Sequence, residues 1–159
     1  MKNARGFTLL EIILVLVFMG LIAGLSTPFV MATLERIKHQ SETRKINSAL
    51  RYTRSEAITR KITTTFNADI HNRQYWISNR EAKKSSITRT LDPEFSFSYI
   101  TGNKETIDRG TFAIKFYPRG NSSGGTIRVA KVSPDKSDSA YEITIDPITG
   151  SSRIEQETQ

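Results

Sequence analysis

An uncharged, mostly apolar run from Ile12 to Ala32 constrains this chain more than any other feature. A helix needs roughly 20 such residues to cross the hydrocarbon core of a bilayer. We therefore expect a transmembrane helix segment over residues 7–32. Glu11 lies at the edge of this segment, and a charged side chain inside a membrane costs about 2.5–3.5 kcal/mol on insertion scales. The sequence thus predicts that a cation meets Glu11.

The apolar run contains residues that weaken a helix, namely Gly20, Gly24 and Pro28 at four-residue spacing. Glycine and proline are frequent in membrane helices, but each weakens the backbone hydrogen-bond ladder locally. Gly20 and Pro28 are therefore predicted to let the helix loosen.

An amphipathic continuation of the helix is predicted over residues 33–61. Its apolar or small positions recur at three- and four-residue spacing, with charged residues between them; they are Leu34, Ile37, Ile46, Ala49, Leu50, Thr53 and Ala57. His39 is expected on the polar side. The complete helix runs from about Phe7 to about Lys61, and its second half needs a partner that buries the apolar stripe.

Strand patterns dominate residues 62–159. Aromatic and branched residues alternate with polar ones in residues 95–99, 112–116 and 141–145, as in half-buried strands. Further expected features are a hairpin of residues 62–66 and 74–77, a loop at 79–90, a turn at 118–125 leading to a returning strand at 126–130, and a final strand near 152–155. The prediction is an α+β chain with one small antiparallel β-sheet domain packed on the helix.

The net charge of +7 is concentrated beside the apolar run. Residues 34–61 carry eight bases and three acids, whereas residues 62–159 carry 13 bases and 12 acids. DNA binding requires exposed bases that neutralise phosphates, and the nearly neutral C-terminal part does not favour it. Nucleic acid is therefore not an expected partner, although a gel shift of the part from about residue 33 onward would test this.

Residue patterns for catalysis or metal binding are missing from the sequence. There are no cysteines, and Asp69 with His71 offers fewer ligands than a zinc site needs. The spacing of Asp135, Asp138 and Asp146 does not match a calcium-binding EF-hand. Neither a nucleophile-elbow nor a phosphate-loop motif occurs. We expect no enzyme activity, cofactor, metal or small-molecule substrate.

Three interpretations of the N-terminus compete. A secretory signal peptide would be cleaved after Ala32, and an uncleaved anchor would keep Lys2 and Arg5 in the cytoplasm. Both leave Glu11 unexplained. In the third interpretation, the cleavage site lies before the apolar run.

The sequence Gly-Phe-Thr-Leu-Leu-Glu at residues 6–11, after a short basic leader, resembles the processing site of type IV prepilins and type II secretion pseudopilins. The resemblance implies a leader peptide of residues 1–6, cleavage by a prepilin peptidase between Gly6 and Phe7, and methylation of the new amine of Phe7. That amine in one subunit would supply the cation for Glu11 of another. Glu11 would then set the register of assembly.

Residues 50–60, 116–125 and 143–150 resemble the GspH/FimT group within this family. That resemblance implies a pilin-like fold, a single pass through the bacterial inner membrane, and a periplasmic β domain at residues 62–159. The implied function is that of a minor pseudopilin near the tip of a type II secretion pseudopilus, with the major and other minor pseudopilins as partners. The alternatives are a FimT- or FimU-like minor pilin of a type IV pilus and a DNA-binding receptor for uptake.

Overall fold

The computed structural model describes residues 8–79, 88–132 and 140–156, apart from the side chains of residues 25–29 and 32. The chain divides into two compact units, Met1–Lys38 and His39–Gln159, which are described separately. The predicted cleavage site at Gly6 and Phe7, and the candidate ligands Asp135 and Asp138, lie outside the described residues.

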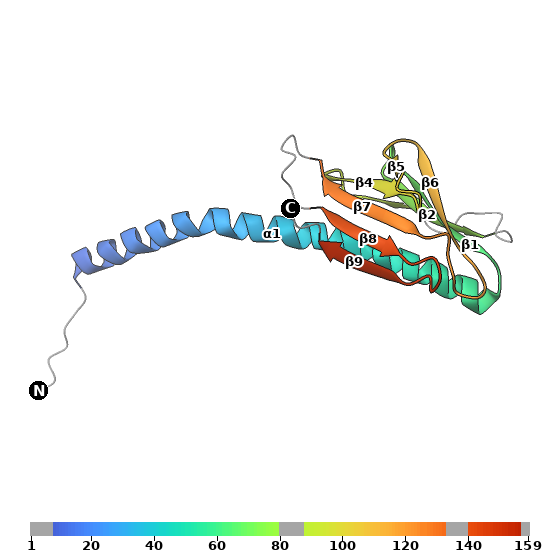
Figure 1. Cartoon of the computed structure of the whole chain (residues 1–159). Coiled ribbons are helices and arrows are strands. Elements are labelled where there is room, and N and C mark those ends of the chain that lie inside the picture. The colour runs from blue at the N-terminus through green and yellow to red at the C-terminus, as the bar shows by residue number, and fades with distance from the viewer. Residues whose placement is uncertain (1–7, 80–87, 133–139, 157–159) are drawn as a thin grey trace, which may run out of the picture. The chain divides into compact units, whose positions relative to one another are not determined.

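One helix, α1 (Leu9–Arg60), confirms the predicted helix to within two residues of its described ends (Figure 1). It ends where Lys61 adopts a left-handed backbone conformation, with φ of 58°, a common way to terminate a helix. The backbone is helical through Gly20 and Pro28. Loosening at these two residues within a filament stays a prediction.

The part of α1 in the first unit exposes its large apolar side chains. Leu34 and Ile37 are 54% and 57% exposed, so the prediction that they begin the buried stripe is wrong. The stripe begins only at His39, where the strands of the second unit cover the helix. Within the described residues, no helix contains a segment of the length and apolarity that crossing a membrane requires.

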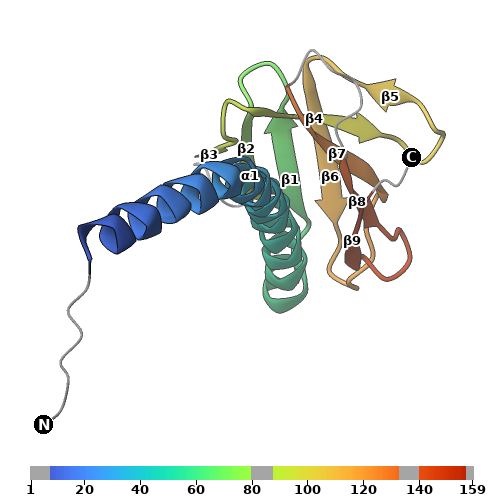
Figure 2. The ribbon, with the colours of Figure 1, turned by 90° about the vertical axis from the view of Figure 1, so that its left-hand side faces the viewer.

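The strands of the second unit form two antiparallel sheets, where one was predicted (Figures 1 and 2). The first sheet has the order β3-β2-β1-β6, with β1 at Thr64–Asp69, β2 at Gln74–Asn79, β3 at Arg89–Thr90 and β6 at Thr111–Phe116. The second has the order β5-β4-β7-β8-β9, with β4 at Phe95–Ile100, β5 at Thr106–Ile107, β7 at Gly125–Lys131, β8 at Tyr141–Ile145 and β9 at Ser152–Gln156. In Figure 2 most of the strands lie to one side of the C-terminal part of α1.

The predicted hairpin around residues 118–125 is wrong in its pairing. β6 pairs with β1, whereas β7 pairs with β4 and β8, so the connection passes from one sheet to the other. Gly124 and Gly125 take positive φ values of 71° and 116° there, which glycine adopts at little cost. The predicted loop at residues 79–90 is also wrong at its ends, which belong to β2 and β3.

The core lies between α1 and the two sheets. On the helix, the predicted stripe of Ile46, Ala49, Leu50, Thr53 and Ala57 is buried. Between the sheets, the ring of Phe112 in β6 stacks on Tyr99 of β4 at a centroid distance of 4.7 Å and meets Phe97 edge-on at 5.9 Å. Such aromatic pairs add about 0.5–1.5 kcal/mol each beyond their buried area. Phe112 therefore joins the two sheets.

Replacing Leu50 tests this core. Leu50 is fully buried, so Leu50→Ala is expected to lower the free energy of unfolding by about 2–5 kcal/mol. Ile148, which is 81% exposed, supplies the control, because Ile148→Ala should change it by less than about 0.5 kcal/mol. The measurement is denaturant unfolding of the full chain in detergent micelles, followed by near-ultraviolet circular dichroism. Equal losses in both variants would contradict the assigned core.

Candidate functional site

The N-terminal end of α1 places Glu11 in the first helical turn, where its side chain is exposed. Its backbone N–H donates to the hydroxyl of Thr8 at 3.3 Å and to the Thr8 carbonyl at 3.1 Å. Thr8 is thus the N-cap, and Thr-Leu-Leu-Glu fits the capping-box pattern. Sequence reasoning missed this pair, although the pattern was visible. In the isolated chain, the positive end of the helix dipole also stabilises the negative charge of the Glu11 carboxylate.

The surface of α1 after Glu11 is apolar on all sides. Each residue from Ile12 to Met19 is large and apolar and is 45–63% exposed. Successive residues of a helix point about 100° apart, so a run of eight covers the whole circumference. A helix that is apolar all round is normally buried in a membrane or inside a larger protein assembly.

His39 occupies a different place from the expected polar side of the helix. It is 6% exposed, its Nε2 lies 3.1 Å from the carbonyl oxygen of Val129, and its ring stacks on Phe95 at 4.9 Å. The prediction was wrong because the buried face begins with polar residues. The hydroxyl of Thr43 donates a hydrogen bond to the backbone carbonyl of His39 at 3.0 Å, so this buried polar group has a partner. Extending the three- and four-residue spacing of the buried stripe towards the N-terminus would have included both His39 and Thr43.

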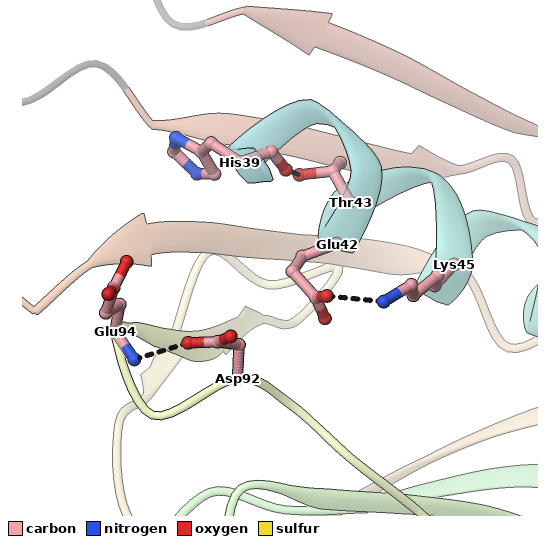
Figure 3. Close-up of polar contacts among 6 residues, drawn as sticks. All are labelled: His39, Glu42, Thr43, Lys45, Asp92 and Glu94. Carbon is pink, nitrogen blue, oxygen red and sulfur yellow. Dashed lines mark hydrogen bonds and ion pairs between the residues drawn. The ribbon is translucent and has the colours of Figure 1, made fainter. Parts of the chain in front are cut away.

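Glu42 adds a charged side chain to this buried start of the stripe. Its carboxylate lies 2.6 Å from the ammonium of Lys45, one turn along α1 (Figure 3). The hydrogen bond and the negative charge of Glu42 raise the pKa of Lys45 above its usual range. In the same view, Glu94 donates its backbone N–H to the carboxylate of Asp92 at 3.1 Å. These contacts hold side chains and backbone of the second unit in place.

The three stretches that carried the GspH/FimT resemblance meet in space. Arg54 of α1 donates its Nε–H to the carbonyl of Gly120 at 3.1 Å and to the carbonyl of Thr149 at 3.0 Å. Gly120 lies in the β6–β7 connection and Thr149 in the β8–β9 turn. We call Arg54 and these two loops, residues 117–124 and 146–151, the Arg54 junction. One helix side chain therefore fixes both loops.

Ser122 and Gly150 close the Arg54 junction further. The hydroxyl of Ser122 donates to the carbonyl of Asp146 at 3.0 Å, and its backbone N–H donates to the carbonyl of Pro147 at 3.0 Å. Gly150 has a φ of 63°, and a Cβ there would lie 2.2 Å from the carbonyl oxygen of Gly120. Only glycine fits this position, which explains the glycine of the Asp-Pro-Ile-Thr-Gly turn.

Asp146, one of the candidate cation ligands, serves the β8–β9 turn. Its Oδ1 accepts hydrogen bonds from the backbone N–H of Thr149 at 2.7 Å and of Ile148 at 2.9 Å. These bonds, with Thr149 contributing most, lower the pKa of Asp146 below its ordinary value. Asp69 likewise accepts hydrogen bonds from the backbone N–H and the side-chain amide of Asn72, at 3.0 Å and 2.8 Å. Among the described residues, no three potential metal ligands lie together.

The lowered pKa of Asp146 predicts a pH-dependent contribution to stability. Its ionised form is favoured by the fold, so the contribution is present above the ordinary value of 3.8 and is lost as pH falls through the lower pKa of the folded state. Asp146→Asn should therefore unfold at a lower temperature than the natural chain near neutral pH, and the gap should narrow below about pH 4. The measurement is thermal unfolding across this pH range.

The matched control for Asp146 is Asp108→Asn, at an exposed side chain. It should leave the unfolding temperature nearly unchanged throughout. A gap for Asp146→Asn that stays constant or widens in acid would contradict the assigned hydrogen bonds.

Comparison with known proteins identifies a matching protein family. A family model described as Type II transport protein GspH matches residues 42–150, which is more than half of the chain. The matched range contains Arg54, Gly120, Ser122 and Gly150, the residues that form the Arg54 junction. No curated protein sequence matches the chain significantly.

Solved structures share the fold at low sequence identity. Two structures of the minor pseudopilin EpsH from the type II secretion system of Vibrio cholerae match with TM-scores of 0.62 and 0.57 and identities of 14% and 13%, covering 77% and 74% of this chain and 96% of each EpsH chain. The type IV minor pilin FimU of Pseudomonas aeruginosa matches with a TM-score of 0.56 and 18% identity, covering 78% of this chain and 91% of the FimU chain. The family match and the shared pilin-like fold lead to one conclusion: the chain belongs to the GspH family of the type IV pilin and pseudopilin superfamily.

Proposed function

We propose that the chain is a minor pseudopilin of a type II secretion system, a structural subunit near the tip of the periplasmic pseudopilus that supports protein export and catalyses no reaction. The observation that carries this proposal is the apolar surface around α1 between Ile12 and Met19, on the same helix in which the match to the GspH family begins at residue 42. Such a surface needs lipid or other helices around it. A subunit that moves from a membrane into a helical filament core provides both.

The proposed life cycle begins at the leader. A prepilin peptidase removes residues 1–6 and methylates Phe7, and residues 7–32 then hold the chain in the inner membrane by a single pass. Residues 33–61 continue the helix into the periplasm, where residues 62–159 form the β domain. Assembly exchanges lipid around α1 for the helices of the major and other minor pseudopilins.

Glu11 has a specific role in this proposal. Its carboxylate is exposed on the isolated helix, and its burial among apolar helices is costly unless a cation meets it. Cleavage after Gly6 places a cationic amine four residues before Glu11. On one helix, the carboxylate lies in the first turn, at the positive end of the helix dipole. Between helices, it would bind the amine of Phe7 in a staggered neighbour. This charge pair would define the stagger more than it would add stability.

A minor pilin of a type IV pilus is the second candidate, because FimU matches with a TM-score of 0.56, against 0.57 and 0.62 for the two EpsH structures. The two functions differ in what fails without the chain. Deletion of its gene should stop protein export if the chain serves secretion, and should stop surface piliation if it serves a pilus. Complementation with the natural chain is the control. The genes beside it distinguish the same two systems.

The mature N-terminus tests the processing step. The expected product, seen by mass spectrometry of the chain purified from membranes with its peptidase, starts at Phe7 and carries one methyl group on the amine. Gly6→Val serves as the control, because a bulky residue before the cleaved bond should leave Met1 in place. A chain starting at Thr33 would instead indicate a secretory signal peptide, and an uncleaved natural chain would indicate a simple tether. Either result contradicts the proposal.

Replacing Glu11 tests assembly. Glu11→Gln keeps the shape but removes the charge, which leaves the amine of Phe7 without a partner in the filament core. We expect incorporation into sheared filaments to fall at least about tenfold, since one-sided loss of a buried pair costs about 3–5 kcal/mol. Membrane insertion should persist, because the uncharged side chain enters lipid more easily.

The matched control for Glu11 is Glu35→Gln, an acid of the same helix beyond the apolar run. It should assemble normally. Unchanged incorporation of Glu11→Gln, measured by quantitative immunoblotting of filament and membrane fractions, would contradict the proposed role of Glu11.

A further inference from the structure

A groove of about 450 Å³ lies between α1 and the β8–β9 turn of the second unit, with both polar and apolar lining. Its charged lining consists of Arg51 and Arg54, one turn apart on the helix. Hydroxyl groups supply most of the remaining polar lining, from Ser55, Thr59, Ser151 and Ser152. The groove therefore offers many hydrogen-bond donors and two positive charges.

Arg54 is held in place for binding. Its Nε–H is used by the carbonyls of Gly120 and Thr149, which fixes the plane of the guanidinium. A guanidinium carries five N–H donors, so the Nη donors remain for another acceptor. Because the backbone already holds the side chain, binding an anion at these donors costs little additional side-chain entropy.

Among the described residues, no acid forms an ion pair with Arg51 or Arg54. The carboxylate of Asp146 belongs to the same β8–β9 turn, but it accepts hydrogen bonds from Ile148 and Thr149. The acids of the surrounding helix are paired elsewhere: Glu42 with Lys45, and Glu56 with Arg60. Arg51 is exposed and has no hydrogen-bond or ion-pair partner among the described residues. The buried hydroxyl of Ser152 also has no hydrogen-bond partner there.

We propose that this groove binds the carboxylate of an acidic segment from another protein. Guanidinium and carboxylate groups match in geometry and form two parallel hydrogen bonds, and the fixed Nη donors of Arg54 with the adjacent Arg51 provide that fork. The exposed hydroxyl-bearing residues of the lining, Ser55, Thr59 and Ser151, offer further donors to the oxygen atoms. That the partner is a neighbouring filament subunit depends on the proposed function; the binding of a carboxylate by the groove does not.

Nucleic acid fits this groove less well. Single strands are held by aromatic side chains on which bases stack, and the groove lining contains no aromatic residue among those described. Duplex DNA requires several phosphate contacts along a basic surface, whereas this groove supplies two arginines. The chemistry therefore favours a protein carboxylate.

A peptide titration tests the groove. The full chain, isotope-labelled and held in nonionic detergent micelles, is titrated with a hexaglutamate peptide blocked at both ends, and amide signals are followed by NMR. We expect shifts concentrated at Ser55, Ser151 and Ser152, and weaker binding at higher salt. Arg51→Gln should weaken binding at least about fivefold, because it removes one charged donor of the pair.

The matched control is Arg44→Gln, at an exposed arginine of the same helix outside the groove. It should leave the peptide affinity unchanged. The unfolding temperature of each variant shows whether the fold persists. We expect that it does in Arg51→Gln, because the Arg51 side chain forms no hydrogen bond or ion pair with the described residues.

Two results would overturn the proposal. One is an equal loss of affinity in both variants, or an absence of shifts at the groove, which would mean non-specific attraction or no binding. The other is a short DNA duplex that causes the same shifts at lower concentration than the peptide. A failed titration leaves processing at Phe7 and assembly through Glu11 untouched, so the two proposals fail separately.

Discussion

The structure depends on a change in the surface of one helix at His39. Before this residue, large apolar side chains of α1 are exposed, and nothing in the first unit covers them among the described residues. From His39 onward, one stripe of the same helix is buried beneath two sheets. The first part of α1 is suited to an apolar environment outside the chain, and the second part to a folded domain. The proposed function, in which one end of the chain is held in a membrane and the other carries the β domain, would make use of this division.

The second unit is stabilised at two places that are far apart in the sequence. Phe112 joins the sheets through its contacts with Tyr99 and Phe97. The Arg54 junction ties the loops at the other edge of the core to the helix through backbone carbonyls. Both loops are therefore fixed to α1 by one side chain. The same arginine also borders the groove proposed to bind a carboxylate, so stability and recognition share one side chain.

The sequence predicted the individual elements better than their arrangement. The alternation of Phe95, Phe97 and Tyr99 correctly gave a half-buried strand, because the period of two reports which side chains face the core. The alternation does not show which strand lies alongside. The prediction therefore paired β6 with β7, although they belong to different sheets. His39 was wrongly assigned to the polar side of the helix, because its residue type was given more weight than its position in the spacing of the buried stripe. The Arg54 junction could not be predicted, since its acceptors are backbone carbonyls, which carry no residue signature. For the site, the motif led to the predictions for Glu11 and the leader, which stay predictions, but the N-cap at Thr8 was overlooked.

The proximity of Glu11 to the mature amine of a neighbouring subunit tests the filament interpretation most directly. The chain contains no cysteine, so a single cysteine introduced at Ile12, next to Glu11, reports one contact. A second cysteine is placed beside the N-terminal amine of the adjoining subunit, and assembled filaments are oxidised. Charge pairing predicts a disulfide-linked dimer in good yield from Ile12, and little from a cysteine at Met19, two turns further along α1. Equal yields from both positions, or no dimer from Ile12, would contradict it.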